Sequence, residues 1–205
     1  MLNIICALKH EARPLVDHFE LVPHGPGHPF VTYQDMDKTM SLTITGIGND
    51  AAAAGTSYAV ERFHTGHSDV WLNIGIAGHK DLTIGTPVLA GTISDSTSGQ
   101  VWHPSVNFIA GLAVLPLVTV DQVPEHYPDN VMIDMEAAGF FISANKVSSW
   151  ERIHCLKIIS DNLLSPPHNI SKQTVVNLVS GNIKVIDAMV ANLYPLTGKP
   201  ATATL

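Results

Sequence analysis

The sequence is poor in cysteine, in basic residues and in long apolar runs, and each shortage excludes a class of protein. The 205 residues include only two cysteines, Cys6 and Cys155, and both lie in apolar runs, where we expect buried free thiols. Lysine and arginine total 11 against 18 acidic residues, which gives a net charge of −7. Because nucleic acids are bound through clustered positive charge and no basic cluster occurs, we expect no nucleic-acid partner.

No apolar run is long enough to span a membrane. The N-terminal run LNIICAL at residues 2–8 follows no basic residue and leads into KHEARPL without a cleavage site, so it predicts neither a signal peptide nor a membrane helix. Hydrophobic residues make up 45% of the chain and charged residues 14%, a composition sufficient for a full core. We therefore expect a soluble, cytoplasmic protein with no membrane partner, one domain over residues 1–194 and a frayed tail over 195–205.

Short apolar runs alternate with segments of helical periodicity. The runs predict buried strands at 2–8, 30–34, 40–45, 70–77, 86–93, 112–120 and 154–160. Helices are predicted at 10–20, 49–64, 135–147 and 171–193, and surface loops at 25–29 and 94–103. Strands that are apolar throughout require cover on both faces of their sheet, so the predicted fold is a three-layer α/β domain.

Three acidic residues stand where predicted strands end: Glu11, Glu136 and Asp161. Two glycine-rich turns, TGIGND at 45–50 and NIGIAG at 73–78, stand at such positions too. Ligands of α/β folds bind at the carboxyl ends of strands. A helix cap or a surface charge is the more ordinary explanation of each acid when it is taken alone, but the three together favour a ligand site.

Five motifs carry a resemblance to a known family. The segments ICALKHEARPL, TGIGNDAAAAGT, NIGIAG, IDMEAAG and IISDN resemble, in order and spacing, the purine nucleoside phosphorylase superfamily. Within it the chain is most similar to methylthioadenosine/adenosylhomocysteine nucleosidases and related nucleoside hydrolases. The resemblance implies a central twisted mixed sheet flanked by helices, a small-molecule nucleoside substrate, no cofactor, and a homodimer or larger homo-oligomer.

The resemblance also implies roles for the acids. Glu136 would accept hydrogen bonds from the ribose 2′- and 3′-hydroxyls, as an acceptor-only carboxylate can, while Met135 packs against the sugar. Asp161 would hydrogen-bond the purine and help to protonate N7, and Glu11 would activate the attacking water. Asp134 matches a position that is often acidic in the family, with a structural cap as the alternative. The implied substrate-binding set further contains Gly48, Asn73, Ile76, Gly78, Ser160 and Val123.

The sequence departs from the family pattern in two places. Ile76 replaces a serine, which makes the pocket more apolar but does not by itself abolish hydrolysis, since a similar GIAG turn occurs in the futalosine-hydrolase-like branch. The segment TVDQVPEHY at 119–127 replaces a longer base-recognition segment and lacks its stacking phenylalanine. Trp102, His103 and Tyr127 either line the base or 5′ side or are exposed loop residues.

The nucleophile follows from what stands at position 73. Family phosphorylases commonly carry an arginine where this chain has Asn73, and an amide cannot replace a guanidinium for phosphate. Of the three arginines, only Arg13 lies near a motif. The sequence therefore predicts an N-ribosyl hydrolase for a purine or purine-like nucleoside, with a phosphorylase as the alternative.

Two further interpretations stay open. The segment TITGIGNDAAAAG contains G-x-G-x-x-A between a strand and a helix, a weak signal for dinucleotide binding. The second interpretation is a nucleoside-binding protein that has lost turnover because of Ile76. The 11 histidines form no metal-binding motif, so no metal site is expected.

Overall fold

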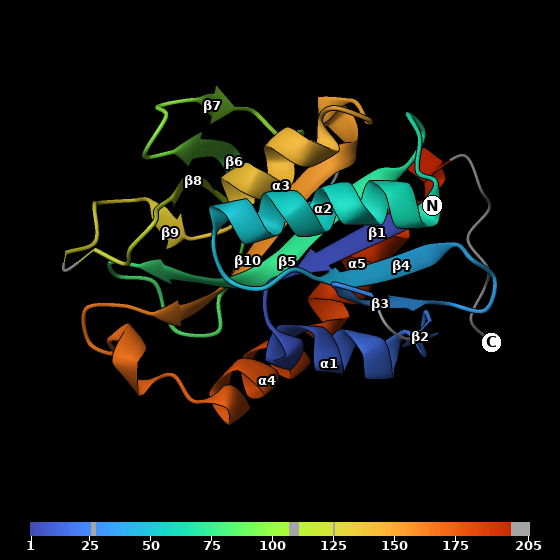
Figure 1. The fold of residues 1–205 in the computed structure, drawn as a ribbon. Coiled ribbons are helices and arrows are strands. Elements are labelled where there is room, and N and C mark those ends of the chain that lie inside the picture. The colour runs from blue at the N-terminus through green and yellow to red at the C-terminus, as the bar shows by residue number, and fades with distance from the viewer. Residues whose placement is uncertain (26–27, 107–110, 125, 198–205) are drawn as a thin grey trace.

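The computed structural model describes residues 1–25, 28–106, 111–124 and 126–197 (Figure 1). Its strands form one mixed sheet in the order β10-β6-β8-β9-β5-β1-β4-β3-β2, with β7 beside β6. The strands are β1 (Leu2–Cys6), β2 (Val22–Pro23), β3 (Val31–Gln34), β4 (Met40–Ile44), β5 (Val70–His79), β6 (Pro87–Asp95), β7 (Val101–Trp102), β8 (Ala113–Thr119), β9 (Met132–Asp134) and β10 (Ile153–Asp161). The helices are α1 (Lys9–His18), α2 (Asn49–Phe63), α3 (Ala137–Ala144), α4 (Lys172–Gly181) and α5 (Ile183–Leu193), with 3-10 turns η1 (Trp150–Arg152), η2 (Pro167–Asn169) and η3 (Tyr194–Thr197).

Helices cover both faces of the sheet, which confirms the predicted three-layer α/β fold. Helices α1, α4 and α5 lie on one face, and α2 and α3 lie on the other (Figure 1). Two apolar cores result, one on each side of the sheet. Trp71 and Leu72, neighbours on β5, belong to different cores, because successive side chains of a strand point to opposite faces.

Half of the sheet closes on itself. Strand β5 runs parallel to β10 and antiparallel to β9, while β10 pairs with β6, β6 with β8, and β8 with β9. These pairings make a ring of five strands. On its other side β5 runs parallel to β1. The carboxyl ends of the parallel strands β1, β5 and β10 therefore lie at one edge of the sheet, where a ligand is expected.

The observed elements differ from the predicted ones in several places, and the short strands β2 and β9 lie outside the predicted strand ranges. The helix predicted at 171–193 is two helices, and residues 172–181 meet 183–197 at 56°. The side-chain amide of Asn182 lies at the break and donates hydrogen bonds to the carbonyl oxygens of Leu178 and Gly85. The predicted loop at 94–103 contains β7, which pairs with β6. Residues 195–197, predicted to fray, belong to η3, and 198–205 lie outside the described residues.

The structure also bears on the cysteines and on the length of the helices. Cys6 and Cys155 are buried free thiols, as predicted. Among the described residues, no single helix is long and apolar enough to cross a membrane, and only α4 and α5 with η3 meet that criterion as a bent pair. The apolar residues of that pair, including Ile186 and Met189, pack into the core on their side of the sheet.

Candidate active site

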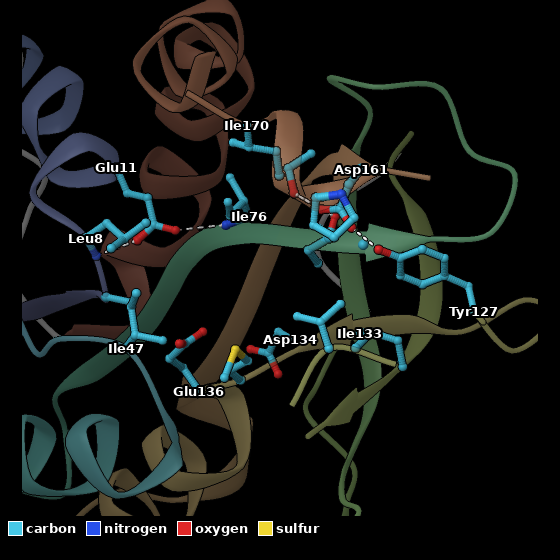
Figure 2. A pocket seen from close by; sticks show the side chains of 17 residues that line it. Leu8, Glu11, Ile47, Ile76, Tyr127, Ile133, Asp134, Glu136, Asp161 and Ile170 are labelled. Carbon is cyan, nitrogen blue, oxygen red and sulfur yellow. Dashed lines mark hydrogen bonds between the residues drawn. The ribbon is translucent and has the colours of Figure 1, made fainter. Parts of the chain in front are cut away.

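A pocket of about 160 Å³ lies at the carboxyl ends of β1, β5 and β10 (Figure 2). Its wall is made by the start of α1, the end of β5, the segment before β9, the turn into α3 and the end of β10. The structure brings together there most of the residues predicted for the site. Those that line the pocket are Glu11, Ile76, Gly78, Val123, Met135, Glu136, Ser160 and Asp161.

Glu11 lies in the first turn of α1 and is 2% exposed. Its Oε2 accepts a hydrogen bond of 2.8 Å from the backbone N–H of Leu8, and its Oε1 accepts one of 3.0 Å from Ile76. Burial raises the pKa of Glu11 to about 7, although these hydrogen bonds and Lys157 act in the opposite direction. A Cβ at Gly75 would lie 3.0 Å from Oε1, so the glycine makes room for the carboxylate.

Glu136 immediately precedes α3, which starts two residues later than predicted. Its Oε1 accepts a hydrogen bond of 2.9 Å from the backbone N–H of Gly48, the residue before α2. Gly48 has a φ of +105°, a conformation that favours glycine. Burial, followed by the charge of Asp134, raises the pKa of Glu136. Figure 2 shows the carboxylates of Glu11 and Glu136 pointing into the same space from opposite walls.

Asp134, which lines the pocket, forms a buried ion pair with Lys157, with 2.8 Å between Oδ2 and Nζ. Asp134 also accepts hydrogen bonds from the backbone N–H of Ala137 at 2.9 Å and from the hydroxyl of Thr119 at 2.8 Å. The capping alternative for Asp134 therefore agrees with the structure. Burial alone would lower the pKa of Lys157, but Asp134, Cys155 and Glu136 raise it.

Lys157 was not predicted as a residue of the site, although its position within an apolar run indicates a buried lysine with an acidic partner. It stands in the apolar run HCLKIIS, and a lysine that is fully buried almost always has an acidic partner. The side chain is 1% exposed, so its charge lies within the protein, where it offsets the negative charge of Asp134 and Glu136. Lys157 thus balances the charge of the acidic pocket without lining it.

Asp161 ends β10, and both of its carboxylate oxygens accept hydrogen bonds from hydroxyls. Ser160 donates to Oδ1 and Tyr127 donates to Oδ2. Tyr127 is 8% exposed and lines the pocket, so it is not an exposed loop residue. A Cβ at Gly78 would lie 2.5 Å from Oδ2 of Asp161 and 2.5 Å from Cε1 of Tyr127, so only glycine leaves space for both.

Two predicted site residues do not line the pocket. Gly48 contributes only through its N–H to Glu136. Asn73 lies deeper in β5, where its Nδ2 donates to the carbonyl oxygen of Ile5 at 3.1 Å and its Oδ1 accepts from Sγ of Cys155 at 3.3 Å. Asn73 therefore links β1 to β10 in the core and does not line the pocket, so its role in substrate binding stays a prediction.

The arginines and the loop aromatics lie elsewhere. Arg13 pairs with Asp17 across 3.8 Å on the outer surface of α1 and is 75% exposed. Trp102 packs against Phe141 with 5.8 Å between ring centroids, and neither it nor His103 lines the pocket. None of the described residues that line the pocket is a lysine or arginine. Within the described part of the chain, no three His, Cys, Asp or Glu side chains are grouped to hold a metal ion.

A second hollow of about 610 Å³ adjoins the pocket and shares four lining residues with it, Ala7, Leu8, Ile76 and Ile170. Its lining is mainly apolar and includes Phe30 and Val31. Lys9, His10 and Lys172 also line it, at the starts of α1 and α4. A ligand in the pocket could therefore extend into a larger space.

Comparison with known proteins relates this fold to nucleosidases. A scan against models of protein families finds no match, and neither does a search of curated proteins. The structure of 5′-methylthioadenosine nucleosidase from Arabidopsis thaliana matches with a TM-score of 0.76 and 17% identity over 97% of this chain and 96% of that chain. Futalosine hydrolase from Helicobacter pylori matches with a TM-score of 0.74 and 17% identity, over 92% of this chain and 96% of its own.

A third structure, the methylthioadenosine/adenosylhomocysteine nucleosidase from Colwellia psychrerythraea in complex with adenine, has a TM-score of 0.73 and 18% identity. It covers 98% of this chain and 97% of its own. The resemblance drawn from the motifs is thus confirmed at the level of the fold. The chain has the nucleoside phosphorylase-like fold of methylthioadenosine/adenosylhomocysteine nucleosidases and futalosine hydrolase.

Proposed function

We propose that the protein is a nucleosidase, an N-ribosyl hydrolase that cleaves the N-glycosidic bond of a purine or purine-like nucleoside. The observation that carries the proposal is the convergence of Glu11, Glu136 and Asp161 on one pocket. Hydrolysis of a glycosidic bond needs one group that assists the leaving group and a carboxylate that activates water on the opposite face of the sugar. A third carboxylate that holds the sugar completes the set.

Glu11 is the group that activates water. A general base works best when its pKa is near the working pH, and burial raises the pKa of Glu11 to about 7. The backbone N–H groups of Leu8 and Ile76 hold the two oxygens in place. Because a carboxylate has about four acceptor sites, capacity remains on Glu11 to take a proton from water in the pocket.

Glu136 binds the ribose, and Asp161 assists the departing base. Gly48 fixes one oxygen of Glu136, so the carboxylate is oriented before a substrate arrives. Two adjacent sugar hydroxyls are donors that match an acceptor-only group. As the bond breaks, the sugar becomes cationic and is stabilised by the negative charge of Glu136 and Glu11. Asp161 shares a proton with the base and makes it a better leaving group.

Water suits this pocket better than phosphate as the nucleophile. A phosphate dianion needs cationic side chains or free backbone donors, and the described lining offers neither lysine nor arginine. The N–H of Gly48 donates to the carboxylate of Glu136, so it is not free to bind a phosphate. The same contact disfavours the dinucleotide alternative, in which the start of α2 would have to bind a pyrophosphate.

The second hollow favours a nucleoside that carries an apolar 5′ substituent, of the methylthioadenosine/adenosylhomocysteine type. With the base against Asp161 and the ribose against Glu136, the 5′ carbon would face the residues shared by both hollows, including Leu8 and Ile76. The mainly apolar lining suits a thioether or another apolar group. The Arabidopsis protein with this fold is a methylthioadenosine nucleosidase, which agrees with this class of substrate.

The resemblance also leads us to propose a homodimer or larger homo-oligomer in the cytoplasm. Leu163 and Leu164 follow Asp161 closely in the sequence and are exposed, which suits a contact surface between subunits. Sedimentation velocity at micromolar concentration tests this assembly, and a monomer would contradict it.

Chromatographic analysis of the products from a panel of nucleosides, with and without phosphate, tests the proposed activity. We expect free purine and free sugar in phosphate-free buffer. A sugar phosphate formed only when phosphate is present would identify a phosphorylase. Binding without any product would identify a non-catalytic binding protein, and hydride transfer with NAD would identify a dinucleotide enzyme.

A further inference from the structure

Tyr127 occupies a position that the proposed reaction does not explain. Among the described residues of the segment 121–130, it is the only buried one. Its hydroxyl donates a hydrogen bond to Oδ2 of Asp161, and its ring lies against Gly78, where no Cβ intervenes. A side chain from an otherwise exposed segment thus fills the space beside the acid that we assign to the base (Figure 2).

The ring and hydroxyl of Tyr127 have the shape and polarity of a base bound to Asp161. A phenol is a flat aromatic ring with a hydrogen-bond donor on its edge, as is a purine with a ring N–H or an amino group. Burial, followed by the hydrogen bond to Asp161, raises the pKa of Tyr127, so the hydroxyl keeps its proton and remains a donor. The space left by the missing Cβ of Gly78 would accept a purine ring as well as the phenol ring of Tyr127.

The pocket beside Tyr127 is small by itself, although the second hollow adjoins it at Leu8 and Ile76. The volume of the pocket is about 160 Å³, whereas sites for small ligands usually measure roughly 300–1,000 Å³. The segment that carries Tyr127 has its other described side chains exposed or half-buried, and Asp129 within it forms an ion pair with Lys80 at the surface. Moving Tyr127 out of the pocket would therefore disturb little of the core.

We propose that Tyr127 competes with the purine base for the carboxylate of Asp161. In the free protein its hydroxyl satisfies the carboxylate, and the base displaces the ring and takes over its hydrogen bond. The inference rests on the proposed function, because that function makes Asp161 the acid that contacts the base. The ligand class is a purine that offers a ring N–H or amino donor to Asp161.

The substitution Tyr127→Phe tests the competition, because it keeps the ring and removes the donor. Tyr58→Phe is the matched control, since the hydroxyl of Tyr58 is buried with no hydrogen-bond partner among the described residues and lies outside the pocket. Calorimetry should measure the binding of adenine, hypoxanthine and guanine to the wild-type protein and both variants. We expect Tyr127→Phe to bind its preferred purine about tenfold more tightly, in the range set by a hydrogen bond to a charged group, and to lower KM without raising kcat.

Three results would count against the inference. Equal or weaker purine binding by Tyr127→Phe, with Tyr58→Phe unchanged and both variants folded, would overturn it and leave the proposed function standing if the wild-type protein hydrolyses nucleosides. Weaker binding by Tyr127→Ala would mean that the ring stacks on the base rather than competing with it. If neither the wild-type protein nor the variants bind any purine, both the inference and the proposed function are wrong.

Discussion

The backbone N–H of Ile76 donates a hydrogen bond of 3.0 Å to Oε1 of Glu11. This bond ties the end of β5 to the first turn of α1 and does not involve the side chain at position 76. The isoleucine, at a position where the nucleosidases that the sequence resembles carry a serine, is therefore compatible with this orientation of Glu11 and makes the wall more apolar. The geometry gives no support to the alternative in which Ile76 abolishes turnover.

Turnover should fall as the pH drops through about 7. Burial raises the pKa of Glu11 to about 7, and only the ionised carboxylate can take a proton from water. Steady-state rates measured across pH should show kcat/KM level above this value and falling about tenfold per pH unit below it. Glu11→Gln should remove this acid limb, whereas Glu61→Gln, at an exposed site on α2, should keep it. An unchanged rate well into the acid range would rule out Glu11 as the base.

Asp161→Asn should lower kcat by at least ~10²-fold, the low end of general-acid contributions. The amide has nearly the size of the carboxylate, so the fold should change little, but it cannot share a proton with the base. Stopped assays of purine release measure the change in kcat, and a thermal unfolding curve shows whether the fold is unchanged. Asp37→Asn, at an exposed turn, is the control. A rate within twofold of wild type would remove Asp161 from the mechanism.

Lys157→Met should destabilise the protein by roughly 3–5 kcal/mol, the cost of leaving a buried charge without its partner. The lysine is 1% exposed and lies 2.8 Å from Asp134, which would lose its compensating charge. Urea unfolding measures the change in the free energy of unfolding. The double variant with Asp134→Asn should recover part of the loss, and the exposed Lys146→Met should cost less than about 0.5 kcal/mol. A small effect of Lys157→Met would show that the pair does not hold this region together.

Gly78→Ala should impair both catalysis and folding. The new Cβ would lie 2.5 Å from both Oδ2 of Asp161 and Cε1 of Tyr127, so one of these groups must shift. We expect a loss of up to about 10²-fold in kcat/KM from misplacement of the acid, and about 1–3 kcal/mol of stability from overpacking. Gly66→Ala is the matched control, because no atom of the part of the chain that the structure describes lies within 4 Å of its added Cβ. Equal activities of the two variants would contradict the close packing at Gly78.

The fold could be predicted from the sequence because its strands are short, apolar and bounded by turn residues. The run at 154–160 lies within β10, and the acid that follows it stands at the edge where parallel strands end. Glu11, Glu136 and Asp161 could be placed in one site for that reason. The break at Asn182 was missed because apolar residues continue at helical spacing on both sides of it.

Residues whose roles depend on distant partners were harder to predict. Asn73 matched a motif, but its depth in β5 and its bonds to Ile5 and Cys155 are set by strand pairing, which one sequence does not reveal. Tyr127 could be either a pocket residue or an exposed loop residue, and its burial and its hydrogen bond to Asp161 decide between the two. Lys157 stands out as a lysine within the apolar run HCLKIIS, but its partner, Asp134, lies on another strand and could not be identified from one sequence.

The most direct test of the central claim is a crystal structure with a C-nucleoside, in which a carbon–carbon bond joins base and ribose and prevents hydrolysis. We predict Glu136 in contact with the 2′- and 3′-hydroxyls, Asp161 against the base and an ordered water between Glu11 and the anomeric carbon. A nucleoside bound elsewhere, or bound in this pocket with its ribose away from Glu136, would contradict the account.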